Sequence, residues 1–166
     1  MRDMLQEAFD DAEYVAPCHT PASEVRKLVG RDEVPDVWLF GFVRDPYAWV
    51  ESIRRYTAQM PDSMLSPWVD DPAEFAHRLH RVCEEEHMTP NGPIMLQCRM
   101  VLGCDKVYRF EDMESAAQDI GFVIGKVLPL QHKNPNGVPP IAIDGEYREA
   151  IATLFALDFK ALNYTP

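Results

Sequence analysis

The feature of this chain that most constrains its fold is a continuous apolar run followed at once by a helix start. Residues 37–43 read Val-Trp-Leu-Phe-Gly-Phe-Val, which is rich in β-forming residues and lacks polar alternation. Such a run is typical of a strand covered on both faces, as in a parallel sheet. Asp45 and Pro46 then have the order of a helix N-cap and a first helical position. The sequence therefore predicts a strand, a tight turn and a helix, with Arg44 at the turn.

The order of strand and then helix recurs further along the chain. Residues 106–110 predict a second strand, which a helix is expected to follow. Alternating strands and helices imply an α/β layer fold with right-handed crossovers, in which ligands bind beyond the carboxyl ends of the strands. That edge is expected to carry His19, Arg44 and Asp112. Glu111 and Asp112 are expected to cap and brace the junction between strand and helix.

Size and charge narrow the classes of function. The 166 residues suffice for one domain with a real core, so a single domain over residues 1–166 is expected. The net charge of −11 disfavours binding to nucleic acid. The chain has no run of 18 apolar residues and no basic-then-apolar N-terminus, so we expect a cytoplasmic protein without a membrane span. The four cysteines form no Cys-x-x-Cys pair, which indicates reduced thiols and no metal site.

The turn between strand and helix also carries the clearest candidate binding residues. Arg44 precedes a helix whose free N–H groups and positive dipole end favour an anion, and Ser52 lies two turns along that helix. A guanidinium fork together with a hydroxyl donor suits a tetrahedral phosphate. The alternative is that Arg44 pairs with a nearby carboxylate, such as Asp45 or Glu51, and that Ser52 is an ordinary exposed helix residue. Spacing alone does not separate the two interpretations.

The residues around Arg44 form part of a longer pattern. Residues 42–47 read Phe-Val-Arg-Asp-Pro-Tyr, and Ser52 follows eight residues after the arginine. This segment resembles the 3′-phosphate-binding motif of sulfotransferases that use 3′-phosphoadenosine 5′-phosphosulfate. The resemblance to the carbohydrate and Golgi-type branch of that family extends to the segments at residues 18–30, 108–113, 130–134 and 158–164.

The resemblance implies a role for each matching residue. Arg44 and Ser52 would hold the 3′-phosphate of the donor, or of the product adenosine 3′,5′-bisphosphate. His19 would be the general base that takes a proton from the acceptor hydroxyl, a task suited to an imidazole. The implied reaction transfers a sulfuryl group to a small-molecule or carbohydrate acceptor and needs no metal. Considered without the family, a lone histidine after a strand is more often a surface or capping residue.

One part of the family pattern has no match in this sequence. The family has a P-loop-like parallel sheet flanked by helices, and its first strand leads into a Lys- and Gly-containing turn that cradles the 5′-phosphosulfate. Here no glycine precedes Gly30, and the first lysine, Lys27, belongs to a different helix. We therefore expect an N-terminally truncated form of this fold. Either Met1 is internal to a longer protein that supplies the loop, or the chain is a non-catalytic relative that binds the nucleotide or a protein partner. A missing first strand would also expose a sheet edge, which predicts a tendency to form homodimers.

Overall fold

The apolar run and the Asp-Pro pair form the predicted strand, turn and helix. In the computed structural model, strand β1 (Phe40–Val43) is followed after two residues by helix α3 (Pro46–Thr57). Asp45 is the N-cap of α3, because its carboxylate accepts the Ala48 N–H at 3.1 Å. Pro46 occupies the first helical position, where its missing N–H costs nothing. The strand is shorter than the apolar run, and residues 38 and 39 precede it without strand structure.

The sheet that contains β1 is small and parallel. Strand β1 pairs with β4 (Lys106–Arg109), with Phe40 opposite Lys106 and Val43 opposite Arg109. The carboxyl ends of the two strands therefore meet at one edge, as the α/β prediction requires. Two further short strands, β2 (Met88–Thr89) and β3 (Gly92–Pro93), form a separate antiparallel pair.

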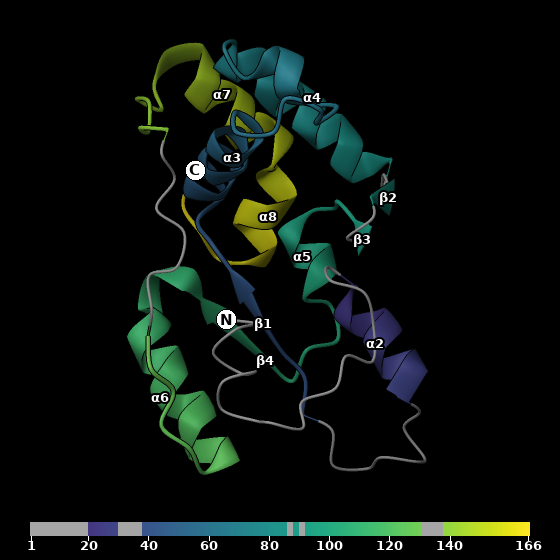
Figure 1. Cartoon of the computed structure of the whole chain (residues 1–166), viewed down its shortest axis with the longest axis vertical. Coiled ribbons are helices and arrows are strands. Elements are labelled where there is room, and N and C mark those ends of the chain that lie inside the picture. The colour runs from purple at the N-terminus through teal and green to yellow at the C-terminus, as the bar shows by residue number, and fades with distance from the viewer. Residues whose placement is uncertain (1–19, 30–37, 86–87, 90–91, 131–137) are drawn as a thin grey trace.

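Helices make up most of the structure, which describes residues 20–29, 38–85, 88–89, 92–130 and 138–166. The sequence therefore folds, at this level of detail, as a helix-rich α/β protein (Figure 1). The apolar spacing of residues 1–9 predicts an amphipathic helix, and that segment lies outside the described residues. The remaining elements are α2 (Ala22–Val29), the 3-10 turn η1 (Ser66–Trp68), α4 (Pro72–Glu84), α5 (Gln97–Met100), the 3-10 turn η2 (Phe110–Asp112), α6 (Met113–Ile124), α7 (Gly145–Leu154) and α8 (Ala156–Ala161).

Two hydrophobic cores stabilise the fold. The larger core lies among α3, α4, α7 and α8, in the upper part of Figure 1, and its fully buried side chains include Phe75, Leu79, Ile151 and Phe155. The smaller core lies between the sheet and α6, where Phe40 and Phe42 pack with Tyr108 and Ile120. Burial of each such side chain contributes about 1.5–3 kcal/mol to folding. The end of β1 thus lies at the junction of the two cores.

The two faces of β1 are covered by different helices. Its aromatic residues face α6, while Gly41 faces the α5 side, where an added Cβ would lie 2.8 Å from Val101 Cγ1. A side chain at residue 41 would therefore displace the segment that follows α5. This close approach explains why the apolar run contains a glycine, and it confirms the prediction of a strand covered on both faces.

Apolar side chains are exposed at the C-terminal end of α6. Phe122 is 88% exposed and Val127, just beyond the helix, is 93% exposed. The predicted tendency to form homodimers stays a prediction. In the described part of the chain, no helix has both the length and the apolar character needed to cross a membrane.

Candidate functional site

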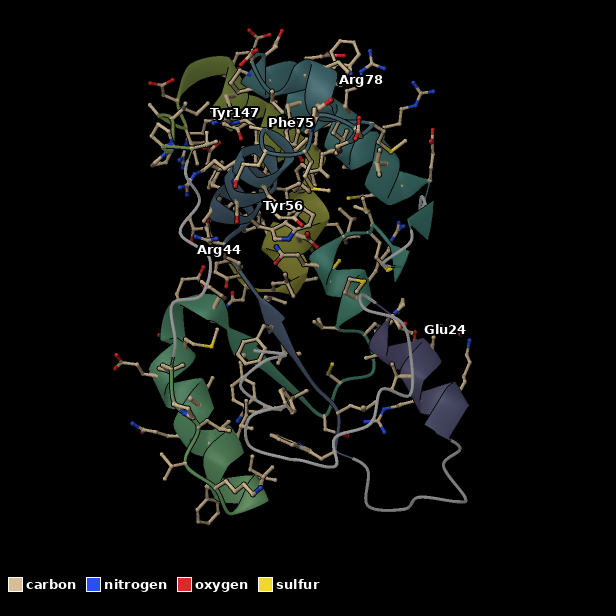
Figure 2. The ribbon with its side chains drawn as sticks, viewed as in Figure 1. Glu24, Arg44, Tyr56, Phe75, Arg78 and Tyr147 are labelled. Carbon is tan, nitrogen blue, oxygen red and sulfur yellow. The ribbon has the colours of Figure 1, made fainter. Side chains whose placement is uncertain are left out.

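Arg44 lies where β1 leads into α3, between the start of that helix and α6 (Figure 2). Its guanidinium carbon lies 5.0 Å from the centroid of the Phe110 ring, and the guanidinium makes no hydrogen bond or ion pair with another described residue. The carboxylates named as its alternative partners are engaged elsewhere. Asp45 caps α3, and Glu51 binds Arg54 at 2.8 and 3.0 Å. The interpretation that Arg44 pairs with Asp45 or Glu51 is therefore wrong.

Ser52 lies two turns along α3, on a half-buried part of the helix surface. Its hydroxyl makes no hydrogen bond with another residue in the described part of the chain. Tyr56, one turn further on, is 59% exposed. With a rise of 1.5 Å per residue, Ser52 lies about 10 Å along the helix axis from the N-cap Asp45. Arg44 and Ser52 thus belong to one rigid unit and flank its first two turns without a direct hydrogen bond between them.

The first turn of α3 differs from the expectation of free N–H groups. The Asp45 N–H donates to Glu111 Oε1 at 2.8 Å, and the Ala48 N–H donates to the Asp45 carboxylate. Pro46 has no N–H to offer. Because two carboxylates already occupy this helix end, its dipole adds little attraction for a further anion. The start of α3 therefore offers fewer free N–H groups than the sequence predicts, so an anion site here would depend mainly on Arg44 and Ser52.

Glu111 joins the ends of the two strands to the C-terminal segment. One carboxylate oxygen accepts the Asp45 N–H, and the other accepts the Tyr164 hydroxyl at 2.9 Å. Burial by itself raises the pKa of Glu111, but the hydrogen bonds from Asp45, its own backbone and Tyr164, together with the positive charge of Arg44, lower the pKa below its ordinary value. The predicted bracing role of Glu111 is confirmed. Asp112 occupies the predicted N-cap position of α6, but its side chain makes no capping hydrogen bond there.

The lowered pKa of Glu111 predicts a pH-dependent contribution to stability. A carboxyl whose pKa is lower in the folded state stabilises the fold above its unfolded pKa of about 4.3, and this contribution is lost as the pH falls through the folded-state pKa. Glu111→Gln is therefore expected to be less stable than the wild type at pH 7, with a difference that shrinks on acidification toward pH 3. Urea unfolding across this range is the measurement, with exposed Glu114→Gln as the control. A difference that stays constant or grows on acidification would contradict the assignment.

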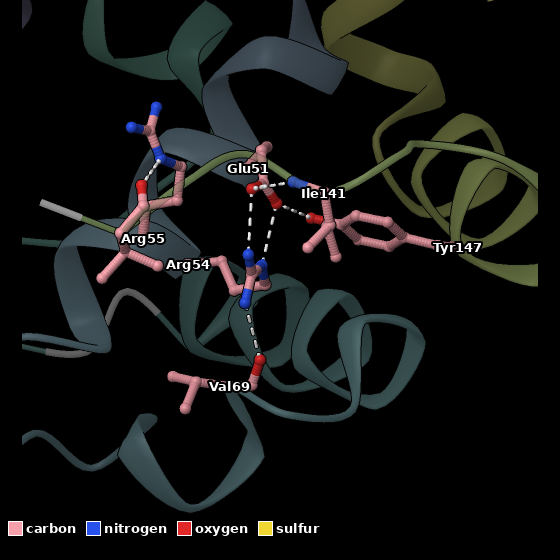
Figure 3. Close-up of polar contacts among 7 residues, drawn as sticks. Glu51, Arg54, Arg55, Val69, Ile141 and Tyr147 are labelled. Atoms are coloured by element: carbon pink, nitrogen blue, oxygen red, sulfur yellow. Dashed lines mark hydrogen bonds and ion pairs between the residues drawn. The ribbon is translucent and has the colours of Figure 1, made fainter. Parts of the chain in front are cut away.

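The segment at residues 138–143 packs against α3. Arg55 Nε donates to the Val138 carbonyl at 2.6 Å, and the Ile141 N–H donates to Glu51 Oε1 at 3.2 Å (Figure 3). Periodicity in the sequence does not reveal these contacts, because each joins residues more than 80 positions apart.

A cavity of about 410 Å³ lies on the other face of the sheet from Arg44. Val43, Val107 and Arg109 contribute to its lining from the strands, and Ala161 and Leu162 contribute from the C-terminal end. Because side chains alternate along a strand, Val43 and Arg44 point to opposite faces. The cavity and the candidate phosphate-binding residues are thus separate features.

The described cysteines are free thiols. Cys98 lies at the cavity wall, where burial and a hydrogen bond to the Asp158 carboxylate raise its pKa to about 12. Burial also raises the pKa of Cys83 to about 12. Thiols with such pKa values stay protonated near neutral pH, so neither is a reactive nucleophile.

Outside the described residues lie His19 and parts of the matching segments at residues 18–30 and 130–134. The structure therefore places Arg44 and Glu111 close together at the carboxyl end of β1, with Ser52 two turns along α3, and the position of His19 stays a prediction. Within the described ranges, no group of three or more His, Cys, Asp and Glu side chains has the arrangement of a metal site. The chain matches no protein family model, no curated protein and no solved structure.

Proposed function

We propose that the protein binds a 3′-phosphoadenosine nucleotide at the carboxyl end of β1, in the manner of the sulfotransferases that its sequence resembles. In this proposal Arg44 and Ser52 contact the 3′-phosphate, and the small parallel sheet is the remnant of a P-loop-like fold. The observation that carries the proposal is that the Arg44 guanidinium makes no hydrogen bond or ion pair with another described residue, although the Glu111 carboxylate is close enough for the charge of Arg44 to lower its pKa. An Arg fork and a hydroxyl can approach a tetrahedral dianion from two directions.

The electrostatic balance at this site sets how much of the affinity must come from direct contacts. Glu111 and Asp45 hold negative charge beside the start of α3, and the whole chain carries a net charge of −11. Long-range attraction of a nucleotide is therefore weak. Charge-assisted hydrogen bonds contribute about 1.5–3 kcal/mol each, so a few contacts to Arg44 and Ser52 would determine binding.

The reaction proposed for a complete site is sulfuryl transfer from 3′-phosphoadenosine 5′-phosphosulfate to a hydroxyl of a small molecule or carbohydrate. The acceptor oxygen bonds to sulfur while the bond between sulfur and the 5′-phosphate oxygen breaks, which releases adenosine 3′,5′-bisphosphate. His19 takes the proton of the acceptor hydroxyl. The family's 5′-phosphosulfate loop has no match in the sequence, so this proposal for catalysis includes its supply by another segment.

A second candidate function is that of a non-catalytic relative that binds the nucleotide or a protein partner. The first turn of α3 favours it, because the Glu111 and Asp45 carboxylates already accept hydrogen bonds from N–H groups that an anion would otherwise use. Transfer of labelled sulfate to a panel of hydroxyl compounds separates the two candidates. Nucleotide binding without transfer supports the non-catalytic one.

Calorimetric titration with two nucleotides tests the proposed binding site. Adenosine 3′,5′-bisphosphate is expected to bind at least about tenfold more tightly than 5′-AMP, which lacks the 3′-phosphate, because the added charge-assisted hydrogen bonds favour the bisphosphate. Ser52→Ala is expected to reduce this difference in affinity between the two nucleotides, whereas Ser115→Ala, at an exposed position of α6, is expected to leave it unchanged. Equal affinities for the two nucleotides, or no binding of either, would contradict the proposal.

A further inference from the structure

The backbone of Arg44 is held by a side chain from a distant segment. Gln97, at the start of α5, donates from Nε2 to the Arg44 carbonyl at 2.9 Å and accepts the Arg44 N–H on Oε1 at 2.8 Å. These are the two hydrogen bonds that a neighbouring strand would make with this residue. Gln97 therefore takes the place of a strand partner at the end of β1.

Gln97 is itself fixed in position. Its side chain is buried, with the residue only 6% exposed, and its backbone N–H donates to Asp158 Oδ2 at 3.1 Å. The Cys98 N–H donates to the other oxygen of Asp158 at 2.8 Å. Asp158 is completely buried in α8, so it caps the start of α5 from outside that helix. A continuous chain of hydrogen bonds thus runs from α8 through α5 to Arg44.

The residue after Arg44 is held from a different segment. The Asp45 N–H donates to Glu111, which in turn accepts the Tyr164 hydroxyl. Gln97 and Glu111 together fix two consecutive residues at the point where the strand becomes a helix. The direction in which the Arg44 side chain leaves the backbone is therefore set by contacts that do not involve its guanidinium.

We infer that Gln97 is a positioning residue for the Arg44 guanidinium in the proposed nucleotide site. Only a carboxamide offers a donor and an acceptor side by side, and asparagine is one methylene too short to replace glutamine in both hydrogen bonds. Small displacements of a binding group weaken charge-assisted contacts steeply, since those contacts depend on distance and angle. This inference rests on the proposed function.

The test compares, for each variant, the ratio of its affinity for adenosine 3′,5′-bisphosphate to its affinity for 5′-AMP. Gln97→Met removes both hydrogen bonds at similar side-chain volume, and it is expected to lower the preference for adenosine 3′,5′-bisphosphate over 5′-AMP by about threefold to tenfold. The affinity for 5′-AMP is expected to change less than about twofold. Gln97→Asn is the second variant, to be used if Gln97→Met does not fold, and exposed Gln118→Met is the matched control. Urea unfolding establishes that each variant is folded at the titration temperature.

A double variant separates positioning from a general structural effect. In an Arg44→Ala background, Gln97→Met is expected to leave the ratio unchanged, because the group that Gln97 positions is absent. The inference would be overturned if Gln97→Met lowered the affinity ratio equally with and without Arg44. It would also be overturned if both Gln97 variants kept the affinity ratio of the wild type. If the wild type itself shows no preference for the bisphosphate, the proposed function fails and the positioning role fails with it.

Discussion

Replacing Glu51 with alanine is expected to lower the free energy of unfolding by about 3–5 kcal/mol. Glu51 and Arg54 are 5% and 6% exposed and form a bidentate ion pair on α3. The Glu51 carboxylate also accepts the Tyr147 hydroxyl at 3.2 Å, and Arg54 Nη1 donates to the Val69 carbonyl at 2.8 Å (Figure 3). Loss of Glu51 leaves the buried Arg54 guanidinium without its counter-charge. It also removes the hydrogen-bond acceptor for the Tyr147 hydroxyl and for the Ile141 N–H.

The pKa values of the partners show how strongly this pair is coupled. The hydrogen bond from Arg54 to Glu51 raises the pKa of Arg54 against the effect of burial. Burial and the charge of Glu51 raise the pKa of Tyr147 far above its ordinary value. Removal of Glu51 removes this effect, but a guanidinium stays charged near neutral pH even when it is buried, so deprotonation does not relieve the cost.

Two comparisons make this prediction specific. Replacing both members of the pair, as in Glu51→Leu with Arg54→Met, is expected to cost less than Glu51→Ala alone, because no buried charge remains. Glu85→Ala breaks the exposed pair with Arg81 and is expected to cost less than about 1 kcal/mol. Urea unfolding measures all three variants. A Glu51→Ala cost below that of the exposed pair would show that the network contributes little.

Replacing Arg44 with alanine is expected to weaken binding of adenosine 3′,5′-bisphosphate about tenfold to a hundredfold. The affinity for 5′-AMP is expected to change little, because that nucleotide lacks the phosphate that Arg44 is proposed to contact. Arg44→Lys keeps the charge but not the planar fork, and its affinity is expected to fall between those of the wild type and Arg44→Ala. Isothermal calorimetry with both nucleotides is the measurement.

The stability of these variants provides the control for binding. The guanidinium of Arg44 lies over the exposed Phe110 ring and its charge lowers the pKa of Glu111, and exposed cation–π contacts contribute about 0.5–1 kcal/mol. Arg44→Ala is therefore expected to fold normally. Arg81→Ala, on the exposed surface of α4, serves as a matched loss of charge away from the proposed site. An equal loss of affinity in both variants would indicate general electrostatics rather than a contact made by Arg44.

Local signals in the sequence predict the elements around the site well. The Asp45-Pro46 pair marks the start of α3, and Asp71 with Pro72 marks α4 in the same way, with the Asp71 carboxylate on the Glu74 N–H. Both predictions depend on interactions within one helical turn, which are legible from neighbouring residues.

Predictions fail where distant segments decide the structure. The sequence predicts one helix over residues 145–157, but the structure breaks it at Phe155, which has a completely buried side chain and a non-helical backbone between α7 and α8. The sequence also predicts a helix over residues 94–102, but only α5 forms there, and Asp158 fixes its start. Tertiary contacts override local helical preference in both places.

The candidate site likewise combines residues placed by local sequence with residues placed by distant contacts. Arg44 and Ser52 belong to one strand-to-helix unit, so their shared location was predictable from spacing. The hydrogen bonds of Gln97 to Arg44 and of Glu111 to Asp45 are not predictable from the sequence, because each joins residues more than fifty positions apart. No local periodicity encodes such contacts.

A crystal structure of the protein with adenosine 3′,5′-bisphosphate tests the central claim most directly. The proposed site predicts that the 3′-phosphate lies within charge-assisted hydrogen-bond distance, about 2.7–2.9 Å, of the Arg44 guanidinium, with the Ser52 hydroxyl as a further donor. A nucleotide bound elsewhere, with the guanidinium still over the Phe110 ring, would contradict it.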